Sequence, residues 1–99
     1  MARWTWDPDK ARTNFLDHKV SFRLAERIFG DPMIATRPDP YREEERWQSV
    51  GKPSADSHVT LFVVHIDPVM QPDGEEEGRI IAARRATARE RRAYEEGRF

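Results

Sequence analysis

Apolar residues recur along the chain with two different periods, and these periods separate helical from extended segments. Phe22, Ala25, Ile28 and Phe29 follow one another at three- and four-residue spacing. This spacing predicts an amphipathic helix whose apolar stripe packs on a core. Ser21 stands directly before the first of these residues and is a favourable N-cap.

Two further helices are predicted from their end signals. Residues 7–18 open on an aspartate–proline pair, in which the carboxylate can accept hydrogen bonds from free amides and the proline suits the first turn. Near the other end of the chain, Thr87 and Glu90 have the spacing of a capping box, and Gly97 suits a C-terminal cap. Gly30 is predicted to provide a left-handed cap for the helix in the middle.

The remaining apolar runs predict strands. They lie at residues 46–51, 58–66 and 79–84, with shorter candidate strands at 3–6 and 33–36. Residues 58–66 are the richest in Val, Leu and Phe, so this strand is expected at the centre of the sheet. Simple alternation in the last strand places Ile80 and Ala82 on one side. Residues 67–78, with two prolines, two glycines and an acidic run, are predicted to form a long mobile loop.

The order of these elements predicts an α+β fold. Connections of hairpin length favour an antiparallel sheet of about four strands, with two N-terminal helices and one C-terminal helix. The 99 residues fit a single domain spanning residues 1–99. Such a domain has a thin core, which favours packing of Trp4 and Trp6 under the sheet over their alternative use as stacking platforms for nucleotides.

Composition narrows the classes of function. The chain has no Cys, so disulfides and thiolate metal sites are excluded and a reducing compartment suits it. The longest apolar run, Leu61–Val64, is too short to cross a bilayer. We therefore expect a cytoplasmic protein with no membrane partner. The three His show no ligand spacing, so neither a metal site nor another cofactor is expected.

Charge is segregated along a chain whose formal net charge is only −1. From residue 79 to residue 99 there are seven Arg and three Glu, whereas residues 75–77 are all Glu. Guanidinium groups grip phosphate oxygens bidentately, so the Arg-rich strand and helix favour binding to a phosphodiester. For Arg91 and Arg92 the glutamates one turn later favour surface ion pairs instead.

RNA cleavage without a metal needs a base for the ribose 2′-hydroxyl, positive charge for the phosphorane and an acid for the leaving oxygen. His65 can serve as acid or base because its ordinary pKa lies near neutrality. Glu44 or Glu45, beside Arg46, is an alternative base. Tyr94 can donate a hydrogen bond or stack on a base.

Several segments, in order, resemble the BrnT toxins. They are Trp6–Ala11 with Asn14 and His18, Val20–Phe22, Ala25, Phe29 with Asp31-Pro32, Glu45-Arg46, Val50-Gly51, Val63–His65, Arg79–Thr87 and Glu90–Glu95. Three features depart from that pattern. Lys19 stands where the family usually has Gly, Ala82 stands where it usually has Ser, and residues 67–78 are longer and more acidic than usual.

The resemblance implies a RelE-like fold, metal-independent ribonuclease activity that inhibits translation, and neutralisation by a BrnA-type antitoxin. That antitoxin has a ribbon-helix-helix domain, so DNA would be contacted only through it. A toxin homodimer inside a heterotetramer is one assembly that the resemblance allows.

Toxins of the RelE-like group commonly use basic residues and a C-terminal Tyr or Arg. By that likeness the catalytic set is expected to be Arg46, His65, Arg79, Arg84 and Tyr94, with Lys10, Arg85 and Arg91 binding RNA. The expectation requires the guanidinium groups to share a cleft where the last strand meets the last helix. The alternatives are a non-catalytic module that binds an antitoxin and modulates its repression of DNA, or a purely structural domain with surface Arg–Glu pairs.

Overall fold

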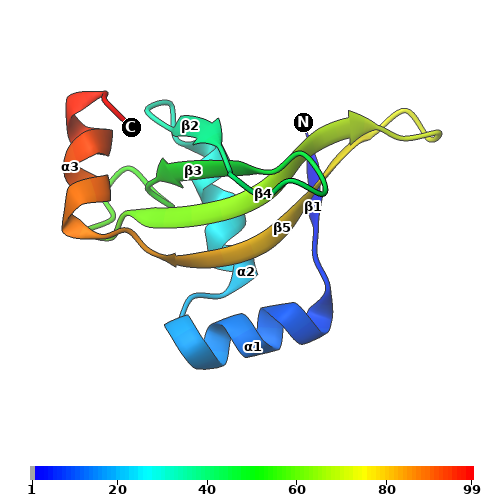
Figure 1. The fold of residues 1–99 in the computed structure, drawn as a ribbon, viewed down its shortest axis with the longest axis horizontal. Coiled ribbons are helices and arrows are strands. Elements are labelled where there is room, and N and C mark those ends of the chain that lie inside the picture. The colour runs from blue at the N-terminus through cyan, green and yellow to red at the C-terminus, as the bar shows by residue number, and fades with distance from the viewer. Residues whose placement is uncertain (1) are drawn as a thin grey trace.

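The computed structural model describes residues 2–99 and contains one five-stranded sheet flanked by helices (Figure 1). Its elements are β1 (Arg3–Thr5), α1 (Pro8–His18), α2 (Phe22–Ala25), the 3-10 helix η1 (Glu26–Gly30), β2 (Ala35–Pro38), β3 (Trp47–Gly51), β4 (Leu61–Met70), β5 (Glu76–Arg85) and α3 (Ala88–Glu96). The strands lie in the order β1-β5-β4-β3-β2. The fold is therefore α+β, as predicted.

The predicted sheet of about four antiparallel strands is wrong in detail, because β1 adds a fifth strand and makes the sheet mixed. β1 pairs in parallel with β5, and Trp4 lies opposite Gly78. A Cβ atom at Gly78 would lie 2.5 Å from the Trp4 ring, so only glycine lets the indole pack this closely on the sheet. Trp4 also stacks on Phe29 with ring centroids 3.9 Å apart, which confirms its predicted place under the sheet.

The long loop predicted at residues 67–78 is largely strand. β4 runs on to Met70 and β5 begins at Glu76, so only a short turn joins them, and the hairpin projects beyond the rest of the sheet (Figure 1). Pro68 favours a loop in the sequence prediction because proline has no backbone N–H to donate to a neighbouring strand. It is accommodated here because the register shifts between Ile66 and Val69, leaving it outside the regular pairing.

A second register shift changes which residues of β5 face the core. Val64 pairs with Ala82 but His65 pairs with Ile80, so Ile81 is an extra residue in β5. The bulge puts Ile80 and Ala83 together in the core, whereas simple alternation had grouped Ile80 with Ala82. A bulge cannot be read from alternation because it breaks the two-residue period that alternation assumes.

The helix face of the sheet, covered by α1, α2 and η1, holds the main core. Phe22, Ala25 and Ile28 are fully buried there against Leu61 and Val63 of the central strand. The predicted caps are confirmed at Asp7, Ser21 and Thr87, each accepting a backbone amide hydrogen bond, and at Gly97, which has φ 68°.

The predicted left-handed cap at Gly30 is wrong. The left-handed residue near the N-terminal helices is Lys19 instead, with φ 59°, where it ends α1. The backbone there takes the left-handed conformation that glycine adopts most easily.

The opposite face of the sheet, which we call the open face, is covered only at one end, by α3 (Figure 1). Val50, Phe62 and Tyr94 form a small second core there. The capping box predicted at Thr87 and Glu90 is present with both hydrogen bonds. This leaves the rest of the open face available to ligands.

Asn14 on α1 provides hydrogen-bond partners for the edge of β5 that is not paired with another strand. Its amide nitrogen donates to the carbonyl of Ala83 at 2.8 Å and to that of Val20 at 3.0 Å, and its oxygen accepts from the Ala83 amide at 3.1 Å. Asn14 is buried, so it replaces the strand that β5 lacks beyond the end of β1.

Replacing Asn14 by Ala is expected to lower the free energy of unfolding by about 2–3 kcal/mol, because buried backbone groups of Ala83 and Val20 lose their partners. Urea denaturation followed by circular dichroism measures the change. Thr13→Ala, one residue earlier and exposed, is the matched control. Equal stability of the two variants would contradict this role for Asn14.

Candidate functional site

Two arginines pair with one carboxylate, that of Glu44, at the open face and away from α3. Arg46 contacts Glu44 at 2.7 Å, and Arg79 contacts the same side chain at 3.3 Å. Arg46 precedes β3 and Arg79 lies on β5, so the strand order brings together residues far apart in sequence. The guanidinium of Arg46 lies 3.8 Å from the ring centroid of Tyr41, which fixes its plane. We call these residues, with Lys10, the Glu44 cluster.

The positive charges of the cluster lower the pKa of Glu44. Its hydrogen bond from Arg46 lowers its pKa, burial opposes this, and the positive charges of Arg79 and Lys10 lower it further. Glu44 is therefore ionised at neutral pH. Arg79 keeps about half of its side chain exposed, at 48%, so it can also reach a ligand in solvent.

Arg84 lies on the open face but does not join this cluster. It is opposite Phe62 in the sheet, lies 4.0 Å from the centroid of that ring, and pairs bidentately with Glu90 at 2.8 and 3.0 Å. Five residues along a strand separate it from Arg79, or roughly 16 Å. The two guanidinium groups pair with different carboxylates, Glu44 and Glu90, so the shared cleft expected at the junction of strand and helix is not formed by this pair.

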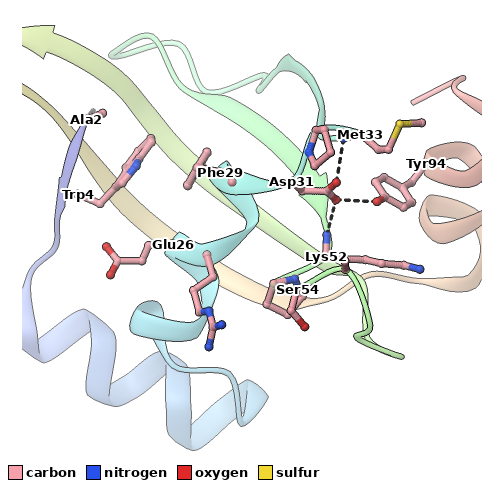
Figure 2. Close-up of a pocket in the computed structure, with 14 residues that line it drawn as sticks. Ala2, Trp4, Glu26, Phe29, Asp31, Met33, Lys52, Ser54 and Tyr94 are labelled. Atoms are coloured by element: carbon pink, nitrogen blue, oxygen red, sulfur yellow. Dashed lines mark hydrogen bonds between the residues drawn. The ribbon is translucent and has the colours of Figure 1, made fainter.

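Tyr94 lies at the end of a pocket of about 840 Å³ on another part of the molecule (Figure 2). Its hydroxyl donates to Asp31 at 2.6 Å, and the same carboxylate accepts from the backbone amides of Lys52 and Met33. Burial, followed by the hydrogen bond and charge of Asp31, raises the pKa of Tyr94 to about 12. The residue ties α3 to the end of η1 and is separate from the Glu44 cluster.

His65 faces the helix side, opposite the cluster, with 2% of its surface exposed. Its Nε2 lies 2.7 Å from Ser49 Oγ, which in turn lies 2.7 Å from Thr36 Oγ1. Nδ1 is 3.1 Å from Asp67 Oδ1, but the alignment is too poor for a hydrogen bond. Burial lowers the pKa of His65 to about 4, so the ring is neutral near pH 7.

The remaining basic residues of the predicted set are scattered. Lys10 lies near Glu44, Arg85 lines a smaller pocket on the helix side, and Arg91 is exposed on α3. The ion pairs predicted from Arg91 and Arg92 to the glutamates one turn later do not form. The structure thus pairs Arg46 and Arg79 with Glu44, and Lys10 lies near enough for its charge to lower the pKa of that carboxyl. The other predicted residues, His65, Arg84, Arg85, Arg91 and Tyr94, lie apart from them.

Tyr41 is the member of the cluster that sequence reasoning missed. It follows Pro38-Asp39-Pro40, which predicts only a rigid loop. An aromatic residue in an otherwise charged stretch before a strand is the one signal that could have pointed to it. The same loop carries Glu44, which with Glu45 is one of the two carboxylates that the sequence predicts as an alternative base.

Other kinds of site find little support in the described part of the chain. Within residues 2–99, no three His, Asp or Glu side chains gather in a way that could hold a metal ion. No helix in that range combines the length and apolarity needed to cross a membrane.

The fold and the Glu44 cluster define a small α+β protein with cationic side chains grouped on an uncovered part of its sheet. The family described as ribonuclease toxin, BrnT, of type II toxin-antitoxin system matches residues 6–90. The chain belongs to this family, and its place in a toxin–antitoxin system implies an antitoxin partner. A search of curated proteins gives no match.

The buried His65 should make stability depend on pH. Its pKa is lower in the folded than in the unfolded chain, so the unfolded state binds more protons as pH falls below about 6.5. From about pH 7.5 to about pH 5 the free energy of unfolding should drop by about 2 kcal/mol from this group.

His65→Gln should remove that part of the pH dependence, whereas His18→Gln, at an exposed position, should not. Urea denaturation at both pH values tests this. A pH slope unchanged in His65→Gln would show that the ring is protonated in the folded protein, held by Asp67.

Proposed function

We propose that the Glu44 cluster is the ribonuclease site of this toxin and that it cleaves RNA without a metal. The observation that carries the proposal is the convergence of Arg46 and Arg79 on one ionised carboxylate at the open face, whose pKa the charge of Lys10 also lowers. Cationic groups already held close together can stabilise a phosphorane without reorganising during the reaction.

The cluster contains the groups that such a reaction needs. Glu44 would take the proton of the 2′-hydroxyl, and Arg46 and Arg79 would hold the phosphate oxygens as charge develops on them. Attack of the 2′-oxygen on phosphorus forms a 2′,3′-cyclic phosphate and releases the 5′-oxygen. Lys10, the remaining proton donor with a positive charge near Glu44, would protonate that oxygen.

The other predicted catalytic residues take supporting roles in this proposal. His65 stabilises the core beneath the site, Arg84 binds α3 through Glu90, and Tyr94 ties α3 to Asp31. Arg85 and Arg91 are exposed cations that can contact RNA outside the cleaved linkage. Cleavage of RNA in the cell would inhibit translation, and a ribbon-helix-helix antitoxin would oppose it.

Arg46→Ala and Arg79→Ala should each lower the rate of RNA cleavage by about 100-fold or more, because each removes positive charge from the transition state. Glu44→Gln should lower the rate while leaving RNA affinity unchanged or higher, since the carboxylate repels phosphate. The measurements are cleavage of a labelled RNA and its binding by fluorescence anisotropy. Arg92→Ala, exposed on α3, is the control.

Loss of activity in the control as large as that in the cluster variants would contradict the proposed site. So would full activity in Glu44→Gln, which would remove the general base from the mechanism.

Cleavage should continue in excess EDTA, because the proposed groups act through proton transfer and fixed positive charge. Purified protein is incubated with RNA in chelator, with and without the protein encoded by the neighbouring reading frame, which should inhibit it if it is the antitoxin. Activity abolished by EDTA and restored by a divalent cation would refute the metal-free mechanism.

A non-catalytic antitoxin-binding module is the second candidate. The observation that favours it is the pairing of Arg46 and Arg79 with Glu44 and of Arg84 with Glu90, which leaves none of these arginines without a counter-ion. Induced expression separates the two functions, since an active toxin arrests growth with loss of RNA and a binding module does neither.

A further inference from the structure

The hairpin between β4 and β5 carries an acidic arm, residues 67–77, that extends past the neighbouring strands (Figure 1). The arm has five carboxylates and no Lys or Arg. Arg3 neutralises two of them, Asp73 and Glu77, but Glu75 and Glu76 have no ion-pair partner within residues 2–99. Val69 and Met70 on the same arm are 59% and 66% exposed. The arm therefore presents apolar side chains beside free negative charge.

The helix side of the molecule carries a surface whose charge is mainly positive, opposite to that of the arm. The pocket of about 840 Å³ adjoins one of about 260 Å³, and the two share Arg27, Pro53 and Ser54. We call their combined surface the basic groove. Its apolar lining includes Trp4, Phe29 and Met33, the last 64% exposed (Figure 2).

The charge of the basic groove is mainly positive. It is lined by four cations, Lys19, Arg27, Lys52 and Arg85, and by two carboxylates, Glu26 and Asp31. None of the four cations forms an ion pair within the described chain. Asp31 is already engaged by Tyr94 and by two backbone amides, so the cations predominate at the surface open to a ligand.

β1 places the arm and the groove next to each other. Ala2 and Trp4 line one end of the groove, whereas Tyr94 lies at the other end (Figure 2). Arg3 and Trp4 pair with Glu77 and Gly78 at the base of the arm. The base of the arm thus lies beside the end of the groove, and the hairpin projects away from the rest of the sheet (Figure 1).

We infer that two copies of this chain exchange acidic arms, each arm lying in the basic groove of its partner. A two-fold axis near β1 would turn the groove of the second copy under the arm of the first, and both contacts would then be identical. From Gly78 to the turn at Gly74 the arm spans about 13 Å, which reaches well into a groove that starts at Trp4. Met70 and Glu76 are paired across the hairpin and so share one face, from which Met70 would meet the apolar lining and Glu76 would meet Arg27 and Lys52. Glu75, at the end of the turn, would lie beside the same cations.

This assembly is independent of the proposed ribonuclease chemistry, because neither the arm nor the groove contains a member of the Glu44 cluster. The partner is a second copy because both complementary surfaces belong to one sequence. An antitoxin segment bound in the same groove is the competing occupant.

Sedimentation of the purified full-length chain over a range of concentrations at low salt should show a monomer–dimer equilibrium that weakens at high salt. The arm variant Glu75→Lys/Glu76→Lys and the groove variant Arg27→Glu/Lys52→Glu should each raise the dimer dissociation constant at least about tenfold. Arg89→Glu/Arg92→Glu, which changes charge on α3 outside the groove, is the matched control and should dimerise like the original chain. Circular dichroism checks that each variant is folded.

The decisive step is to mix the two variants. In the mixture a positive arm meets a negative groove and a negative arm meets a positive groove, so a heterodimer should form although neither variant dimerises alone. A monomeric original chain, a dimer unaffected by the reversals, or a mixture that stays monomeric would each overturn the inference. If Arg27→Glu/Lys52→Glu instead abolishes binding of the neighbouring gene product while the original chain is monomeric, the groove belongs to the antitoxin.

RNA cleavage by the arm and groove variants is measured in parallel. It should remain at the level of the original chain, so loss of dimerisation and failure of the proposed ribonuclease site give different results.

Discussion

The pairing of β4 with β5 is the interaction on which the rest of this structure depends. It holds the two longest strands side by side over most of their length and separates two faces with different chemistry. His65 and Ile80 point to the helix side, whereas Arg79 points to the open face. The same pairing continues beyond the sheet as the acidic arm. One hairpin therefore sets the core, the cationic cluster and the projecting surface.

The bulge within this hairpin decides how the charges are distributed. Without the extra residue at Ile81, either Ile80 or Ala83 would leave the core, because side chains alternate strictly in a regular strand. With it, Arg79 and Arg84 both face the open side, yet each has its own carboxylate. Glu44 gathers the cations near β3, and Glu90 binds Arg84 to α3. The charged residues thus form two separate groups rather than one arginine-lined cleft.

Buried polar side chains complete the sheet where the backbone cannot. Asn14 satisfies the unpaired part of β5, and the chain of hydroxyls from Thr36 through Ser49 to His65 crosses the strands on the helix side. Each of these groups is costly to bury without its partner, so together they fix the positions of α1, β2 and β3.

The sequence by itself determined the α+β class, the caps at Asp7, Ser21, Thr87 and Gly97, and the family, because these depend on local spacing and on ordered motifs. Only the tertiary structure decided the parallel place of β1, the register shifts, and which cations meet. Those outcomes depend on contacts between segments far apart in the chain, such as Trp4 on Gly78 or Arg79 on Glu44. His65 shows the difference most clearly, since its residue type suggested acid–base chemistry and its burial, which no local pattern specifies, placed it in the core.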